Sequence, residues 1–279
     1  MLAKLLIYTT MNEAFTLAIA GSFILGLRHG IDWDHLAAIT DIVGAKSSQD
    51  FGSKIFFGHE QKEAVKLSLF YAIGHAAIVI LLGLAAINFA LILPKWLDPI
   101  MERLVGLTLL FLGFWIIYSL WQYLQGQNNF RFVSRWMLIF AAIKSTSKWL
   151  TNKFAGGHEK PNMAVDKYEP RAALIVGMLH GIGAETGTQI LLITAVGGSV
   201  QSIGLAMLFA FAGGLIFSNM LIGACGSLGF LSLKNYTRLY ALSGACTAVF
   251  SLIIGAFFIT GHIASLPDLQ TIFTKAATN

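Results

Sequence analysis

The sequence predicts an all-α polytopic membrane protein of about six transmembrane helices, arranged as a 3+3 inverted repeat. Three observations support this fold class. Of the 279 residues, 56% are hydrophobic and 12% are charged, with a mean hydropathy of +0.70, whereas soluble domains carry roughly 25% charged residues. Six apolar runs are long enough to cross a bilayer as a helix, which takes about 20 residues. A short polar motif occurs twice, in the first and the fourth of these runs.

The predicted spans, in chain order, are 14–40, 65–93, 100–123, 172–196, 203–228 and 239–263. They divide the chain into a first three-helix repeat (1–123), a basic cytoplasmic connector (124–171) and a second three-helix repeat (172–279). The first apolar run has no small-residue cleavage site before Arg28, so we interpret it as a retained helix and not as a signal peptide.

Basic residues set the predicted orientation. Of the 19 Lys and Arg residues, fourteen lie in or directly beside the connections between spans 1 and 2, 3 and 4, and 5 and 6. The positive-inside rule therefore predicts that these connections face the cytoplasm and that both termini lie outside. We expect a multi-pass protein of the plasma (inner) membrane. This topology explains the net charge of +5, so the expected partner of the basic residues is the lipid bilayer and not nucleic acid.

The repeated motif predicts the internal symmetry. The segment from Gly26 to Asp34 aligns without gaps to the segment from Gly177 to Glu185, and both have the form G-x-x-H-G-I-x-x-acid. An odd number of spans separates the two copies, so they cross the membrane in opposite directions. Inverted repeats of this kind are typical of secondary transporters, in which the binding site lies at the repeat interface. The sequence itself gives no clear match of span 2 to span 5, or of span 3 to span 6.

Ionisable residues in the first span indicate a binding site. Burial of two imidazoles and two carboxylates in an apolar run is costly without a partner, and a cation is the natural one. At 100° per residue, His29, Asp32 and His35 share one face of a regular helix. Asp34 points away from that face and joins it only if the helix opens near Gly30. The alternative to a cation is an ion pair between Asp32 and Arg28, which stand at i,i+4 spacing.

The second span and the second motif copy add further candidates. His75 is either a core residue or a site ligand, and the small residues around it permit close helix approach. The candidate metal ligands are His29, Asp32, Asp34, His35, His75, His180 and Glu185. Imidazole and carboxylate without thiolate fit a borderline divalent metal such as Ni, Co, Zn, Mn or Fe(II), and suit Cu(I) poorly.

Motifs that are absent from the sequence narrow the function. There is no G-x-x-x-x-G-K-[ST] phosphate loop, and the H-E pair at His59 and Glu60 lacks the second His of H-E-x-x-H. We therefore expect a secondary transporter or permease and not an enzyme, with the metal as substrate and no permanently bound cofactor. Three alternatives remain open, namely efflux through the same site, an intramembrane metalloenzyme, and a b-type haem protein that uses two of His29, His75 and His180.

Several motifs resemble the nickel/cobalt transporter (high-affinity nickel permease) family. The segment from His29 to His35 has the H-x-x-x-x-D-H form of the family signature, and Arg28 and Asp32 fit its longer R-H-x-x-D-x-D-H version. The pair Gly74–His75 is similar to the family's G-H helix motif, and residues 185–189 resemble its D-T-x-T-E segment.

The resemblance implies a divergent branch that takes up Ni²⁺ or Co²⁺. It also implies that His29, Asp32, Asp34, His35 and His75 form the metal pathway. The chain departs from the family pattern at Trp33, where a small residue is usual, and at Gln189, where the family has Glu. Family members commonly have eight spans.

Overall fold

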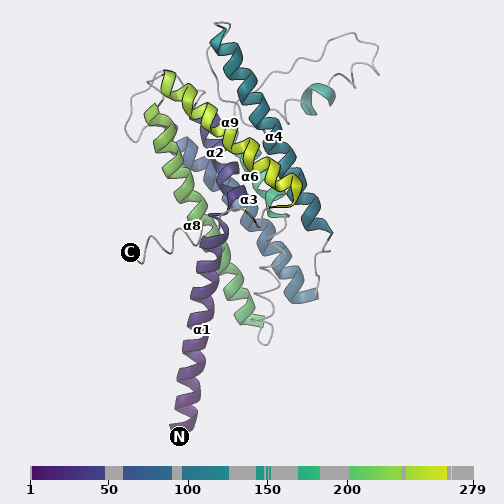
Figure 1. Cartoon of the computed structure of the whole chain (residues 1–279). Helices are drawn as coiled ribbons and strands as arrows, with labels where there is room; N and C mark the ends of the chain where they lie inside the picture. The colour runs from purple at the N-terminus through teal and green to yellow at the C-terminus, as the bar shows by residue number, and fades with distance from the viewer. Residues whose placement is uncertain are drawn as a thin grey trace.

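The protein is described here by a computed structural model that covers residues 2–47, 59–89, 96–125, 143–147, 149, 151, 169–182, 201–233, 237–262 and 265. Throughout these residues the regular structure is helical (Figure 1). The named helices are α1 (Leu2–His29), α2 (Trp33–Ser47), α3 (His59–Phe89), α4 (Leu97–Leu124), α6 (Pro170–Gly181), α8 (Gln201–Leu233) and α9 (Thr237–Thr260).

Within these residues, α3, α4, α8 and α9 are each long and apolar enough to cross a membrane. The pair α1 and α2 also passes as one span, although it is bent by 58° at the residues between the two helices. The prediction of an all-helical polytopic protein is therefore confirmed, with four to five candidate spans in the described part. The predicted fourth span is described only as α6, since residues 183–200 lie outside the described part, and the total of six stays a prediction.

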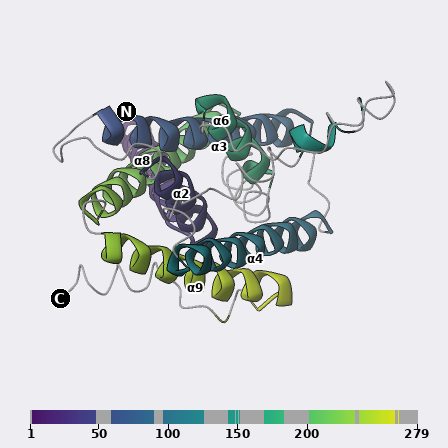
Figure 2. The same cartoon turned by 90° about the horizontal axis from the view of Figure 1, so that it is seen from above.

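The helices pack in pairs around α2. α1 packs against α8, α3 against α6 and α8, and α4 against α9. Figure 2 shows α2 between the α4 and α9 pair and the group of α3, α6 and α8. On one side Ala37 of α2 packs with Leu109 and Phe258, and on the other Ile39 packs with Leu67. This packing places the first turn of α2 in the centre of the molecule.

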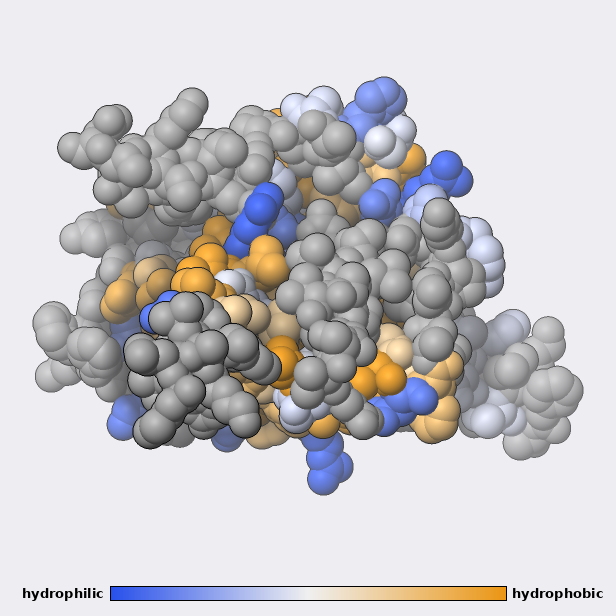
Figure 3. Space-filling view, turned by 90° about the horizontal axis from the view of Figure 1, so that it is seen from below, coloured by the Kyte–Doolittle hydropathy of each residue, from blue (hydrophilic) through white to orange (hydrophobic). Residues whose placement is uncertain are grey.

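Large apolar side chains cover the outside of the bundle. Leu17, Leu81, Leu107 and Phe114 are each at least 60% exposed, and Figure 3 shows apolar side chains reaching the surface on the face seen from below. Exposed apolar side chains on helices long enough to span a bilayer suit contact with lipid tails.

The helix ends on both sides of the first and third basic connections, and the α4 end before the second, gather at one end of the molecule. These are the C-terminal ends of α2, α4 and α8 and the N-terminal ends of α3 and α9 (Figure 1). The arrangement is the one that the positive-inside prediction requires. The assignment of this end to the cytoplasm stays a prediction.

Candidate metal centre

The candidate site lies at the break between α1 and α2. α1 ends at His29, α2 begins at Trp33, and the bend between them is 58°. In the break the Ile31 N–H donates to the Arg28 carbonyl at 3.1 Å, a short-range bond that tightens the last turn of α1. The break lies directly against α8 because Gly30 has no side chain. A Cβ at Gly30 would collide with Ser218 Oγ.

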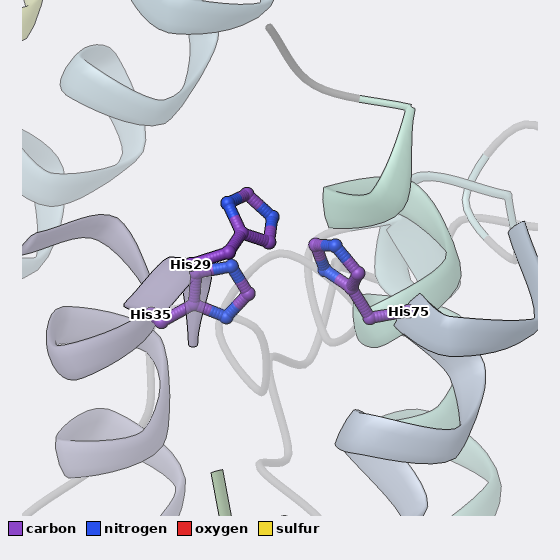
Figure 4. A group of neighbouring side chains, drawn as sticks. All are labelled: His29, His35 and His75. Atoms are coloured by element: carbon purple, nitrogen blue, oxygen red, sulfur yellow. The ribbon is translucent and has the colours of Figure 1, made fainter. Parts of the chain in front are cut away.

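Four helices each supply one histidine to a buried cluster. His29 of α1, His35 of α2, His75 of α3 and His180 of α6 are at most 7% exposed. The ring centroid of His35 lies 4.8 Å from those of both His29 and His180, and 4.7 Å from that of His75. Figure 4 shows the rings of His29, His35 and His75 close together, with His75 approaching from the opposite helix. Residues far apart in the sequence thus form one group of imidazoles.

Asp34 connects α2 to α6. Its Oδ2 accepts a hydrogen bond from His180 Nε2 at 2.8 Å, and its Oδ1 accepts one from the His35 backbone N–H at 2.8 Å. The carboxylate also lies in the first turn of α2, where the positive end of the helix dipole stabilises a negative charge. Both oxygens are therefore held in place next to the histidines.

The cluster contains two groups of residues with metal-ligand spacing. We call them the three-histidine set (His29, His35 and His75) and the aspartate set (Asp34, His35 and His180). Within each set, one ligand atom from each residue lies within 4.8 Å of the others. Both ring nitrogens of His75, and Nε2 of His35, are buried without a hydrogen-bond partner among the described residues. Buried polar atoms without partners are costly, so a bound cation fits these positions.

Comparison with known proteins gives two curated relatives. Both are the high-affinity nickel-transport protein NixA of Helicobacter pylori, from strains J99 and 26695, at 25% and 24% identity over 235 residues. Each match covers 78% of this chain and 65% of the relative. The chain is a divergent relative of the nickel permeases. The resemblance that the motifs predict is thereby confirmed. No protein-family model matches the chain, and no solved structure matches it.

Of the two cases that the sequence left open, the helix that opens near Gly30 is the one observed, because α1 stops at His29 and α2 begins at Trp33. Asp32 lies in the break, where its carboxylate is 3.9 Å from His29 Nδ1 and its side chain is 22% exposed, and it belongs to neither ligand set. Asp34, which a regular helix would turn away, lies in the aspartate set. Glu185 lies outside the described residues.

Two aromatic residues that the motifs did not reveal border the cluster. The Tyr71 hydroxyl lies 3.4 Å from His35 Nδ1, and the Tyr71 ring is 5.8 Å from that of His180. The Phe211 ring is 5.7 Å from that of His29. The position of Tyr71 one turn before His75 puts both on one face of α3, a signal present in the sequence. No comparable signal marks Phe211.

Proposed function

We propose that this chain carries a divalent transition-metal cation across the membrane, with Ni²⁺ as the favoured substrate and Co²⁺ as the alternative. The observation that carries the proposal is a cluster of four buried imidazoles and one half-buried carboxylate at a broken helix, among helices apolar enough to cross a bilayer. The relatives, named as high-affinity nickel-transport proteins, favour Ni²⁺. Broken helices are a usual place for the ion sites of secondary transporters.

A transported cation explains how Asp34 can stay charged among apolar helices. An isolated carboxylate at the bilayer centre costs roughly 3 kcal/mol on insertion scales. A divalent ion next to it offsets that charge, while the neutral imidazoles supply further ligands. The metal is cargo and not a resident cofactor, and the chain acts as a permease and not as an enzyme.

Two corresponding contacts support the inverted repeat. The first motif copy lies at the end of α1, and the second lies at the end of α6. A Cβ added at Gly26 would collide with the Phe211 carbonyl of α8. A Cβ added at Gly177, the matching glycine, would collide with the Tyr71 carbonyl of α3. These contacts suggest that α1 corresponds to α6, and that α8 corresponds to α3.

The same correspondence is supported in the reverse direction. A Cβ at Gly74 of α3 would collide with the Leu174 carbonyl of α6, and a Cβ at Gly214 of α8 would collide with the Phe23 carbonyl of α1. Leu174 and Phe23 occupy matching places, because each stands three residues before the first glycine of its motif copy. The two halves thus use the same close backbone contacts.

The third helix pair fits a two-fold relation as well. A Cβ at Gly106 of α4 would lie 2.8 Å from the Gly255 carbonyl oxygen of α9, and a Cβ at Gly255 would lie 2.9 Å from the Gly106 carbonyl oxygen. A reciprocal contact of this kind is expected where a two-fold axis passes between corresponding helices. We therefore propose repeats at 1–123 and 172–279, joined by the connector 124–171.

The membrane potential is a sufficient driving force for uptake. A divalent cation that moves inward through 100 mV gains about 4.6 kcal/mol, twice the roughly 2.3 kcal/mol of one charge. Because about 1.4 kcal/mol corresponds to a factor of ten, this supports roughly thousandfold accumulation. We propose uptake across the plasma membrane, with the basic connections in the cytoplasm.

Uptake of radiolabelled Ni²⁺ into membrane vesicles of known orientation tests the proposal. His75→Ala is expected to abolish uptake, because both His75 ring nitrogens lie buried in the cluster. His262→Ala is the matched control, since His262 is exposed beyond the end of α9. Equal Ni²⁺ uptake by the two variants would overturn the proposal. Competition by Co²⁺, Zn²⁺ and Mn²⁺ in the same vesicles identifies the preferred ion, and vesicles of the opposite orientation distinguish uptake from efflux.

A haem protein is the less favourable alternative. Two axial histidines would have to hold a macrocycle between rings that already lie close together, for example His29 and His75 at 5.4 Å between centroids. The visible absorption spectrum of the purified protein tests this directly.

A further inference from the structure

Close contacts between α3 and α8 fix the register of these two helices. A Cβ at Gly83 of α3 would meet the side chain of Leu208 of α8, and a Cβ at Gly223 of α8 would meet the side chain of Ser68 of α3. Later residues of one helix therefore contact earlier residues of the other. The helices are antiparallel, as Figure 1 also shows.

In this register, Tyr71 and Phe211 border the histidine cluster from opposite ends. By these contacts, Phe211 of α8 lies beside the part of α3 that is about nine residues after Tyr71. At 1.5 Å per residue, Tyr71 and Phe211 are therefore separated by roughly 13 Å along the helix axis. His75 lies between these two levels. Phe211 contacts the ring of His29, whereas Tyr71 contacts the ring of His180. The cluster therefore has a His29 end and a His180 end along the helix axes.

The two ligand sets are displaced toward these opposite ends. The three-histidine set contains His29, and the aspartate set contains His180. His35 belongs to both sets, and its ring centroid is 4.8 Å from that of His29 and 4.8 Å from that of His180. His35 is thus midway between the two ends.

Coordination distances favour binding by one set at a time. Metal–nitrogen bonds of about 2.1 Å keep opposite ligand atoms within about 4.2 Å of each other. Each set spans up to 4.8 Å, so small side-chain movements close it around an ion. In the described part of the chain, His75 and Asp34 do not belong to the same set. One ion therefore cannot use both sets fully in this arrangement.

We propose that the cluster holds a single metal ion in two successive positions, with His35 as the common ligand. This inference rests on the proposed transport function. In the predicted orientation α3 begins at the cytoplasmic end, so the three-histidine set faces outside and the aspartate set faces the cytoplasm. An ion moving inward exchanges the other ligands of the first set for those of the second without leaving His35. Neutral imidazoles receive the ion, and the Asp34 carboxylate then attracts it inward.

X-ray absorption spectra of Ni²⁺ bound to the purified full-length chain test the two positions. His180→Asn is expected to retain an ion with three imidazole ligands, because the three-histidine set stays intact. His75→Asn is expected to retain an ion with two imidazoles and a carboxylate. His35→Asn removes a ligand from both sets and is expected to weaken binding about tenfold or more relative to either variant. His262→Asn is the matched control and keeps the wild-type spectrum.

The outcomes separate this proposal from the transport proposal. A wild-type protein that transports Ni²⁺ but holds it with all five side chains at once overturns the two positions alone. The same follows if His75→Asn and His180→Asn give one spectrum, or if His35→Asn binds as well as they do. A wild-type chain that neither binds nor transports Ni²⁺ overturns both proposals. Where an Asn variant does not purify as a folded protein, the Ala variant at that position takes its place.

Discussion

Replacement of Gly26 by alanine tests the close packing of α1 against α8. The added Cβ would collide with the Phe211 carbonyl oxygen and lie 2.8 Å from its carbonyl carbon, whereas ordinary contacts are 3.4–4 Å. A backbone carbonyl cannot rotate away, so the helices must separate by roughly 1 Å. Overpacking of this kind costs about 1–3 kcal/mol, and the greater helix propensity of alanine returns about 1 kcal/mol. We expect a net loss of stability of up to about 2 kcal/mol.

Gly21→Ala is the matched control, because it lies on the same helix and its Cβ meets nothing within 4 Å. Both variants gain the same helix propensity, so the difference between them isolates the collision. At roughly 2–4 °C per kcal/mol, a collision cost of about 1–3 kcal/mol should make Gly26→Ala unfold roughly 2–12 °C below Gly21→Ala in detergent. Gly177→Ala is expected to lose a similar amount, since its Cβ would collide with the Tyr71 carbonyl. If Gly26→Ala and Gly21→Ala unfold at the same temperature, the packing argument is refuted.

Three further predictions concern binding, stability and driving force. Tyr71→Phe removes the hydroxyl 3.4 Å from His35 Nδ1 and should weaken Ni²⁺ binding about tenfold in a calorimetric titration, while the exposed Tyr118→Phe has no effect. Asn219→Leu replaces a buried amide without a hydrogen-bond partner among the described residues. Removal of a buried polar group without a partner should raise the unfolding temperature. The variant should also slow Ni²⁺ uptake, because the amide lies beside the helix break at Gly30. Collapse of a 100 mV inside-negative potential should lower Ni²⁺ accumulation by up to about a thousandfold, and accumulation that ignores the potential would contradict potential-driven uptake.

Composition was sufficient to predict the helical membrane fold. Apolar runs of span length have few other stable structures in lipid, because their backbone polar groups must be satisfied internally. The same reasoning singled out the histidines, since an imidazole in an apolar helix needs a partner. It could not supply Tyr71 or Phe211, whose roles depend on which helices pack together. Aromatic residues are common throughout the chain, with 21 Phe and 7 Tyr, so their presence alone carries no signal.

The helix break was the step that periodicity could not supply. A pattern read at 100° per residue assumes one continuous helix, and under that assumption Asp32 joins the histidines and Asp34 does not. In the structure Asp34 joins the histidines and Asp32 does not, because α2 begins at Trp33 after a 58° bend. Gly30 marks the break in the sequence, but a glycine in an apolar helix serves equally well for close packing. Gly30 serves both purposes here: it lies in the helix break, and its lack of a side chain lets the break pack against Ser218.

Under the proposed inverted repeat, backbone contacts persist where side-chain chemistry has diverged. Gly74 and Gly214 occupy matching places, and the residues that follow them are His75 and Leu215. A collision with a backbone carbonyl penalises every residue larger than glycine, so such positions tolerate little change. A metal ligand is needed in only one of the two repeats, so the matching position in the other repeat is free to change. This difference accounts for a repeat whose second and third helices show no clear sequence match, and for the concentration of ligands on α1, α2 and α3.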